Sequence, residues 1–168
     1  MRPTAEVIRQ AFDYERETGL IRFRTGGRGK IRGGGRGPLP GDVAGCPIRD
    51  GWRIKFKSVE YPAAVIAFVI VEGRWPAADV DHQDRDRMNN RWANLREATR
   101  SQNLANTGTF PHSAPYKGVS FDQQTGKWRA RIGVNGRLLH LGRFADLEAA
   151  HSAYLDAARK YFGEFARG

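Results

Sequence analysis

The spacing of apolar and polar residues predicts short helices and strands in the first two thirds of the chain. Residues 63–72 are almost wholly apolar and precede Gly73, which is typical of a buried helix closed by a glycine cap. Residues 52–57 alternate apolar with basic side chains, which indicates a strand with one buried and one cationic face. A capped helix and a hairpin are expected over residues 4–23. The pattern therefore predicts a small region of mixed helices and strands.

Strict alternation marks the C-terminal third. Residues 127–134 alternate apolar and basic side chains, Asn135 and Gly136 form a strong two-residue turn signal, and residues 137–144 supply the returning strand. A preceding strand is expected over residues 116–121. A helix with an apolar stripe follows and fits the core face of the sheet. The pattern predicts three antiparallel strands backed by one helix, with the opposite sheet face left basic.

Two segments of different composition separate these regions. Residues 26–41 are rich in Gly and Arg and low in apolar side chains, so we expect a mobile basic loop. Residues 107–115 contain Gly and Pro without periodicity, which is typical of a linker. We therefore expect an N-terminal domain over residues 1–106 and a second domain over residues 116–168.

The charge balance indicates the kind of partner. The 28 Lys and Arg residues outnumber the 18 Asp and Glu residues and give a formal charge of +10, which favours nucleic acid. A membrane surface is the alternative, but it would require a basic amphipathic helix. The apolar stretch is too short to span a bilayer, and the first residues contain no secretory signal. The single Cys46 excludes an intramolecular disulfide; we expect it to be buried and the protein to be cytoplasmic.

Candidate chemistry centres on Asp81 and His82, a carboxylate beside an imidazole. Asp81 and Asn103 offer oxygen ligands suited to Mg²⁺ or Mn²⁺, and Mg²⁺ binds few protein groups and completes its shell with water and phosphate oxygens. His82 is suited to take a proton from an attacking water. In-line hydrolysis of a phosphodiester would leave 5′-phosphate and 3′-hydroxyl ends. A lone Asp–His pair is more often a surface turn, so the prediction depends on its spacing to Asn94 and Asn103.

The local pattern predicts a ββα unit around this pair, with its core at about residues 78–106. Residues 80–82 are expected to end one strand, and residues 94–97 to form a second. Thr99 and Gln102 fit a capping box, which would open a helix there and define where Asn103 points. Adjacent residues on a regular strand point to opposite faces, so the pair must stand at a strand end to serve one phosphate.

This region resembles phage and intron-encoded HNH endonucleases of the subtype whose last motif residue is Asn. The shared positions are residues 73–76, 81–82, 89–91, 94–96 and 99–103. The resemblance implies a ββα-metal fold, a metal-dependent DNA endonuclease of homing type in a bacterial or phage-infected cell, and a role for Asn94 in holding the imidazole of His82. Relatives often carry a His–Arg pair on the preceding helix, where this chain has Ala64 and Val65. Because of this departure, weak or lost cleavage remains an alternative.

Residues 116–167 resemble the Apetala-two/ERF DNA-binding domain. The similarity rests on residues 116–119, 126–130, 141–144, 148–150, 154 and 156–158. It implies a sheet that enters the major groove, with contacts at Lys117, Ser120, Arg129, Arg131 and His140. The alternating pattern adds Lys127 to the same charged face. Plant members carry Trp at the position of His140, so their target sequence is not transferred.

Taken together, these features predict an α+β protein, with a ββα-metal nuclease domain followed by a three-stranded sheet on one helix. Its partner is expected to be double-stranded DNA, without a membrane or an evident protein partner. Asn89 and Asn90 are expected to be turn formers. Arg91, Arg96 and Arg100 are either phosphate clamps or solvated charges. Two functions stand: an endonuclease, nicking or site-selective, and a catalytically weak or inactive DNA-binding protein that acts by occupancy.

Overall fold

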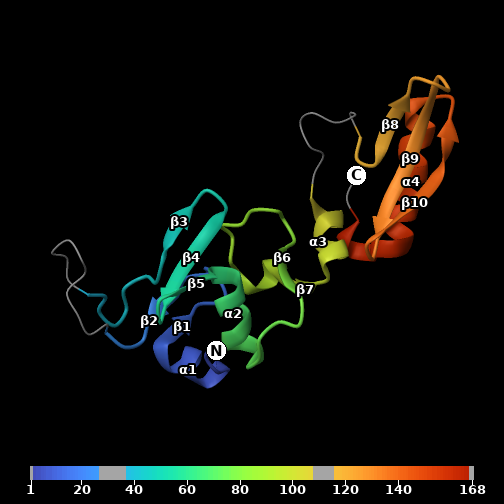
Figure 1. The fold of residues 1–168 in the computed structure, drawn as a ribbon. Coiled ribbons are helices and arrows are strands. Elements are labelled where there is room, and N and C mark those ends of the chain that lie inside the picture. The colour runs from blue at the N-terminus through green and yellow to red at the C-terminus, as the bar shows by residue number, and fades with distance from the viewer. Residues whose placement is uncertain (1, 27–36, 108–115, 167–168) are drawn as a thin grey trace. The chain divides into compact units, whose positions relative to one another are not determined.

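The computed structural model describes residues 2–26, 37–107 and 116–166 (Figure 1). It forms two compact units, Met1–Glu97 and Ala98–Gly168. The division falls earlier than the expected linker at residues 107–115, because helix α3 (Arg100–Asn106) packs with the C-terminal unit. Residues 108–115 of that linker lie outside the described residues, as do residues 27–36 of the expected basic loop.

The first unit consists of small sheets and two helices. Helix α1 leads into the β1–β2 hairpin, strands β3, β4 and β5 form an antiparallel sheet in that order, and β6 pairs with β7 after helix α2 (Figure 1). The bounds are α1 Ala5–Ala11, β1 Phe12–Tyr14, β2 Ile21–Phe23, β3 Cys46–Ile48, β4 Gly51–Phe56, β5 Val59–Pro62, α2 Ala63–Glu72, β6 Asp79–His82, η1 Trp92–Asn94 and β7 Leu95–Ala98.

Helix α2 is the centre of the first core. Its bounds match the expected apolar helix, and Gly73 closes it in a left-handed conformation with φ +73°. A left-handed cap suits glycine because it has no Cβ to clash. Ala64 is 3% exposed and Val65 packs against the same core. Ala64 and Val65, where the resemblance implies a His–Arg pair, are therefore packing residues.

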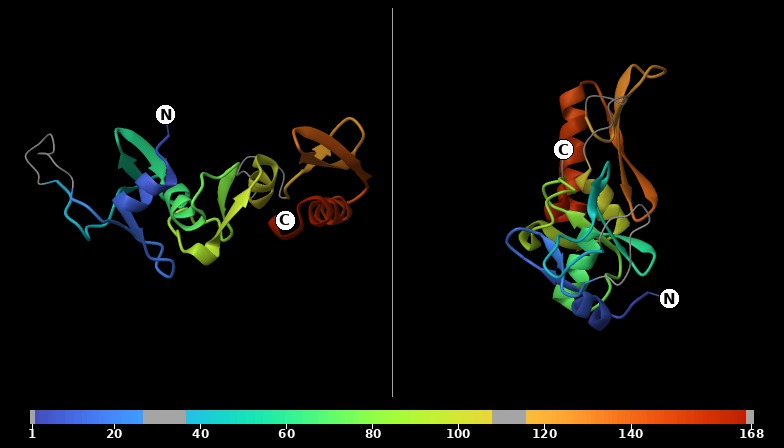
Figure 2. Two further views of the ribbon diagram at one scale, coloured as in Figure 1. Left: turned by 90° about the horizontal axis from the view of Figure 1, so that it is seen from below. Right: turned by 90° about the vertical axis from the view of Figure 1, so that its left-hand side faces the viewer.

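The second unit combines α3 with a sheet and a long helix. Strands β8 (Val119–Asp122), β9 (Lys127–Val134) and β10 (Arg137–Phe144) form an antiparallel sheet with β9 in the centre. Helix α4 (Leu147–Phe162), followed by η2 (Gly163–Phe165), covers one face of this sheet (Figure 2). The buried side chains between them are Val119, Ala130, Ile132, Ala150, Tyr154 and Ala158. The opposite sheet face carries mostly polar residues, with the exposed Leu138 among them.

An irregularity in β10 changes which residues reach that opposite face. His140 pairs with Arg131, and after a register shift Arg143 pairs with Arg129. Directly opposite residues in an antiparallel pair share a face. The extra residue therefore brings His140 and Arg143 to the same side, although strict alternation would separate them.

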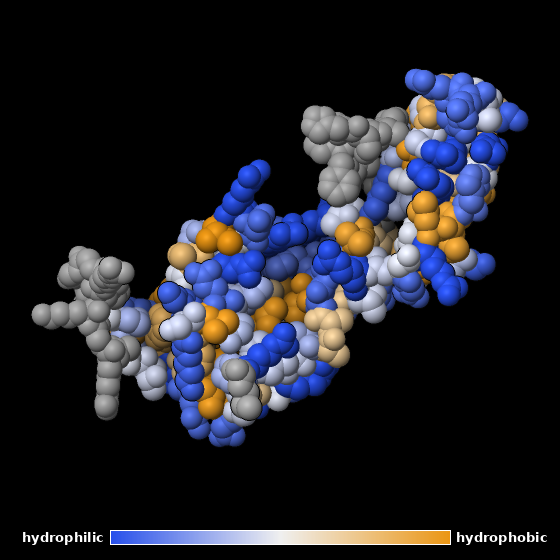
Figure 3. All heavy atoms as spheres, viewed as in Figure 1, coloured by the Kyte–Doolittle hydropathy of each residue, from blue (hydrophilic) through white to orange (hydrophobic). Residues whose placement is uncertain are grey.

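The surface agrees in part with the expectations from composition. Hydrophilic residues cover most of the visible face of each unit (Figure 3). None of the helices in residues 2–26, 37–107 and 116–166 has the length and apolar character needed to cross a bilayer. Cys46 is exposed, so the expectation of a buried thiol was wrong. The reason is that β3 is an edge strand whose three residues are all exposed.

Candidate functional site

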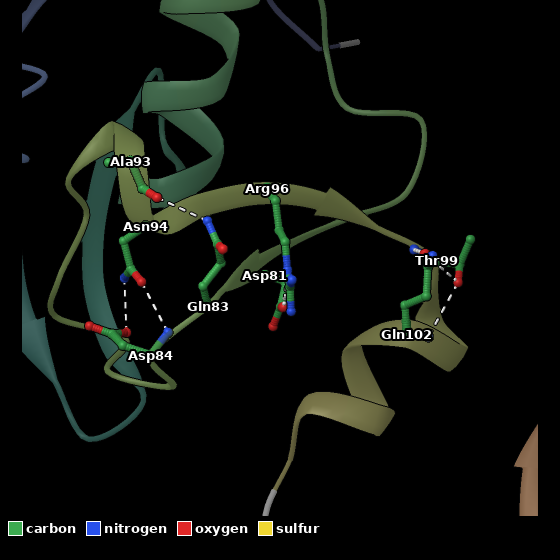
Figure 4. A network of polar contacts seen from close by, with 8 residues as sticks. All are labelled: Asp81, Gln83, Asp84, Ala93, Asn94, Arg96, Thr99 and Gln102. Atoms are coloured by element: carbon green, nitrogen blue, oxygen red, sulfur yellow. Dashed lines mark hydrogen bonds and ion pairs between the residues drawn. The ribbon is translucent and has the colours of Figure 1, made fainter. Parts of the chain in front are cut away.

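Strand β6 carries the Asp81 and His82 pair at its end, as expected. Asp81 is buried, and its Oδ2 accepts a hydrogen bond of 3.0 Å from Nε of Arg96 on β7 (Figure 4). The side chains of Arg96 and Asp81 are 12% and 5% exposed. Arg96 was expected to contact DNA or to be a solvated charge, but burial makes it the partner of Asp81 instead.

His82 is held through one of its ring nitrogens. Its Nε2 lies 3.1 Å from Oδ1 of Asn90. The Asn90 amide is oriented by its Nδ2, which donates to the carbonyl of Met88 at 3.3 Å. Because an amide oxygen only accepts, Nε2 must carry the ring proton, and Nδ1 then carries the lone pair. This tautomer suits His82 to act as a base through Nδ1.

Asn90 in turn is held by the β1–β2 hairpin. The backbone carbonyl oxygen of Asn90 accepts a hydrogen bond of 2.7 Å from the Tyr14 hydroxyl. Burial raises the pKa of Tyr14 to about 12, so this hydroxyl keeps its proton. Gly19 has φ +78°, and a Cβ at this position would lie 2.5 Å from the carbonyl carbon of Asn90. The hairpin therefore reaches Asn90 closely only because residue 19 is glycine.

Asn94 makes different contacts from those expected. Its Oδ1 accepts from the backbone N–H of Asp84 at 3.0 Å, and its Nδ2 donates to Oδ1 of Asp84 at 2.9 Å and to the carbonyl of Asn89 at 2.8 Å (Figure 4). Asn94 thus ties the β6–β7 loop together, whereas the amide on His82 belongs to Asn90. The expectation of Asn90 as a simple turn former is corrected by its burial, at 5% exposed.

Asp84 is the centre of that loop and was missed in the sequence. In addition to Asn94, it accepts hydrogen bonds from the backbone of Asp86 at 2.8 Å and from Nδ2 of Asn89 at 2.7 Å. Desolvation opposes ionisation, but the hydrogen bonds from Asn89, Asp86 and Asn94 outweigh it and lower the pKa of Asp84. The available signal was the spacing of Asp84 and Asp86, which favours side-chain-capped turns.

Helix α3 begins as the sequence predicted. The hydroxyl of Thr99 accepts from the backbone of Gln102 at 3.3 Å, and Oε1 of Gln102 accepts from the backbone of Thr99 at 2.8 Å (Figure 4). This confirms the predicted capping box. Asn103 lies in the first turn, where its N–H bonds to the carbonyl of Thr99 at 2.9 Å. Asn103 therefore belongs to the second unit, while Asp81 and His82 belong to the first.

The donors suit a sparsely liganded divalent ion. No group of three or more His, Cys, Asp and Glu side chains within the described parts of the chain could hold a metal. A Mg²⁺ site needs no such group, because water and substrate phosphate complete its shell. Asp81 supplies a carboxylate, of which Oδ2 is bonded to Arg96, and Asn103 supplies an amide oxygen. Each is by itself an oxygen donor of the kind that a hard ion takes.

The polar face of the C-terminal sheet gathers most of the expected DNA contacts. Ser120, Arg129 and Arg143 pair across three strands, and Arg131 pairs with His140. Ser120 Oγ and Arg129 Nε are buried atoms that lack a hydrogen-bond partner in the part of the chain that the structure covers. We call this surface the basic face; it consists of Ser120, Asp122, Lys127, Arg129, Arg131, His140 and Arg143, with Nε of Arg143 lying 3.5 Å from Oδ2 of Asp122. Arg143 was missed because the register shift in β10 is not visible in the sequence.

Three other expected DNA contacts lie elsewhere. Lys117 donates from Nζ to the carbonyls of Leu104, Ala105 and Thr107 at 2.8, 2.6 and 2.6 Å, so it binds the end of α3 rather than the basic face. Arg91 and Arg100 are exposed, as a phosphate contact requires.

A comparison with known protein families finds one match in this region. The family model described as HNH endonuclease matches residues 61–105, which extend from β5 through α3. Residues 61–105 of the chain are therefore similar to HNH endonuclease domains. Asp81, His82, Asn90, Asn94 and Asn103 all lie within this matched segment.

Two relatives extend the comparison beyond the HNH domain. An uncharacterised HNH endonuclease of Acanthamoeba polyphaga mimivirus is 35% identical over 99 residues, which are 58% of this chain and 51% of the viral protein. The APETALA2-like protein 2 of Oryza sativa is 39% identical over 56 residues, which are 33% of this chain and 13% of the rice protein. The chain therefore spans about half of the viral relative and a small part of the plant one.

Proposed function

We propose that this protein is a divalent-metal-dependent endonuclease that hydrolyses phosphodiester bonds in double-stranded DNA. The observation that carries the proposal is the held imidazole of His82, which stands next to the buried Asp81–Arg96 pair within the matched HNH segment. The exposed single Cys46 fits a reducing, cytoplasmic setting.

His82 is the proposed general base. Its Nδ1 accepts a proton from the water that attacks phosphorus, while the contact from Nε2 to Asn90 keeps the ring in the required tautomer. The water oxygen bonds to phosphorus as the bond to the 3′ oxygen breaks, which leaves a 5′-phosphate and a 3′-hydroxyl once solvent protonates the leaving oxygen.

Asp81 and Asn103 are the proposed metal ligands. Arg96 holds the Asp81 carboxylate at its Oδ2, and the capping box begins the helix that carries Asn103. A bound Mg²⁺ or Mn²⁺ would stabilise the charge that develops on the phosphate and the 3′ oxygen. The few protein ligands leave most of its shell to water and substrate.

The basic face is the proposed DNA-recognition surface. Its arginines match the geometry of guanine edges in the major groove, and its lysine suits a phosphate. Ser120 and Arg129 stand opposite each other on this face, so both side chains would meet the same stretch of DNA. The similarity to a protein named APETALA2-like supports this assignment. The exposed Arg91 and Arg100 add candidate phosphate contacts.

A second function is favoured by one observation. Ala64 is buried in the core of the first unit and Val65 packs against that core, at the two positions where the HNH resemblance leads us to expect a His–Arg pair. If catalysis needs those polar groups, the protein binds DNA and acts by occupancy.

Supercoiled plasmid distinguishes the two functions. With Mg²⁺ the endonuclease is expected to produce nicked or linear DNA that DNA ligase reseals, because the ends are 5′-phosphate and 3′-hydroxyl. Chelation of the metal should abolish the reaction. Stable DNA binding without conversion of the plasmid in either Mg²⁺ or Mn²⁺ would favour occupancy instead.

A further inference from the structure

Lys117 holds the helix that carries Asn103. We propose that Lys117 is a positioning residue of the nuclease site, acting through α3, and not a DNA contact. This inference rests on the proposed function, because Asn103 is a metal ligand only in that proposal. Lys117 lies outside the matched segment 61–105, so the family match does not assign it.

The ammonium of Lys117 is satisfied by the last turn of α3. Its Nζ lies 2.8 Å from the carbonyl oxygen of Leu104 and 2.6 Å from those of Ala105 and Thr107. An ammonium has three N–H donors, and these three acceptors match them. The last carbonyls of a helix lack partners within the helix, and a cation there also complements the helix dipole. The positive charge of Lys117 therefore faces the carbonyl oxygens at the end of α3 rather than a phosphate of DNA.

The other end of α3 is held by the same unit. The hydroxyl of Ser101 accepts a hydrogen bond of 3.0 Å from the backbone of Asn135, in the β9–β10 turn. Ala105 is 4% exposed in the core that α4 and the sheet share, and Asn106 is 2% exposed. Asn103 lies between Ser101 and Ala105. The unit that carries the basic face thus fixes the helix of the proposed metal ligand at both ends.

The contact between Lys117 and α3 matters because the boundary between the two units falls within the HNH segment. The HNH segment runs through β6 in the first unit and α3 in the second. The contacts that fix Asn103 therefore come from residues of the DNA-binding unit. Lys117 links the two activities, since its loss would disturb a nuclease residue while leaving the basic face intact.

A matched pair of variants tests the proposal. Lys117→Met removes the three donors at nearly constant length, and Lys127→Met makes the same change at an exposed position on the basic face. Amide hydrogen exchange over residues 100–106 should accelerate in Lys117→Met alone. The Mg²⁺ concentration for half-maximal cleavage should rise about tenfold in that variant, the loss typical of a group that supports a metal ligand.

DNA binding should be affected in Lys127→Met and not in Lys117→Met, the reverse of the effects on exchange and on the Mg²⁺ requirement. Lys127→Met should lower the slope of log affinity against log salt concentration by about one, whereas Lys117→Met should leave it unchanged. Lys117→Arg retains N–H donors, so exchange over residues 100–106 and the Mg²⁺ requirement should stay at their wild-type values. If Lys117→Met does not fold, Lys117→Gln, which is shorter and has only two N–H donors, takes its place with the same expected changes.

One outcome of these experiments would refute the role of Lys117, and another would refute the proposed function. Unchanged exchange in α3 together with a lower salt slope in Lys117→Met would make Lys117 a DNA contact and refute this inference. Accelerated exchange in Lys117→Met, with no cleavage by the wild-type protein in any divalent metal, would instead refute the proposed function and, with it, the catalytic meaning of the contact.

Discussion

The contact between His82 and Asn90 determines which ring nitrogen of His82 carries the proton in the neutral imidazole. Since Oδ1 of Asn90 faces Nε2, the lone pair resides on Nδ1. Tyr14 and Gly19 fix the backbone of Asn90 from the β1–β2 hairpin. The N-terminal hairpin is therefore part of the support of the proposed base, although it lies outside the matched HNH segment.

Changing Asn90 should alter the pH dependence of cleavage. In Asn90→Asp, a carboxylate beside Nε2 would favour the protonated imidazole, so cleavage should require a higher pH than in the wild type. Asn90→Ala removes the acceptor without adding charge and should lower the rate about tenfold, with a smaller change in the pH profile. Rates of plasmid nicking from pH 5 to 9 measure both effects. A profile that does not move in Asn90→Asp would contradict the assigned contact.

Residue types and spacing predicted His82, Asp81 and the capping box, but not the partners of the asparagines. Asn90 and Asn94 are both polar residues in one loop, and nothing in their local pattern tells which amide faces inward. The burial of Asn90 depends on Tyr14 and Gly19, which are distant in sequence. A long-range contact of this kind leaves no periodic signal.

At the level of elements, the β6–β7 loop behaves as a folded unit rather than a flexible connection. Asp84 accepts from Asn89, Asn94 and the backbone of Asp86, and a Cβ at Gly51 would lie 2.9 Å from the carbonyl of Arg87. The hydrogen bonds hold the loop together, and the close approach at Gly51 shows that the loop passes directly beside β4. The loop therefore presents Asn90 in one arrangement.

An ion pair clamps β7 to the segment that follows α2. Glu97 accepts from Nη2 of Arg74 at 2.7 Å and from Nη1 at 3.2 Å, and it also accepts from the backbone of Ala77. The Arg74 hydrogen bonds are the main cause that lowers the pKa of Glu97 from 4.5 to about 2. Because the folded-state pKa is depressed, this stabilisation is complete above pH 4.5 and is lost as the pH falls toward 2.

The Glu97 clamp predicts a specific acid sensitivity. Glu97→Gln should lower the free energy of unfolding at pH 7 and should flatten its decline between pH 4.5 and 2. Glu60→Gln, the same change at an exposed position on β5, should do neither. Urea unfolding at several pH values measures the difference. Equal pH dependence in Glu97→Gln and the wild type would show that the clamp contributes nothing.

The bounds of helices and strands were easier to predict than the register between strands and the packing between elements. The bounds of α2, β9 and β10 follow the apolar pattern closely, since periodicity is a local property. The shift in β10 that brings Arg143 to the basic face has no such pattern. Lys117 could not be assigned either, because its acceptors belong to a helix that the sequence placed in the other domain.

For the whole molecule, the charge of +10 favours attraction to DNA in general, and the basic face is the proposed recognition surface. Arg129 and Arg131 stand in the central strand β9, with Ser120, His140 and Arg143 beside them. Arg159 is on α4, which covers the other face of the sheet, and its side chain is 72% exposed. It provides a control with equal charge.

Replacing the central arginines should weaken DNA binding. Arg129→Ala and Arg131→Ala should each reduce the affinity for duplex DNA about tenfold, a loss typical of an arginine that contacts a base or a phosphate. Arg159→Ala should have little effect, although it removes the same charge. Titration of labelled DNA at two salt concentrations measures this. Equal losses in all three variants would indicate a general effect of net charge rather than a sheet in the groove.

The rate of plasmid cleavage by His82→Ala, compared with the wild type, tests the central claim most directly. Both proteins are incubated with supercoiled DNA and Mg²⁺ at concentrations that saturate binding, and affinity is measured in parallel. The account predicts a rate loss of about 100-fold or more with unchanged DNA affinity, since the basic face is intact. Equal cleavage rates for the two proteins would contradict it.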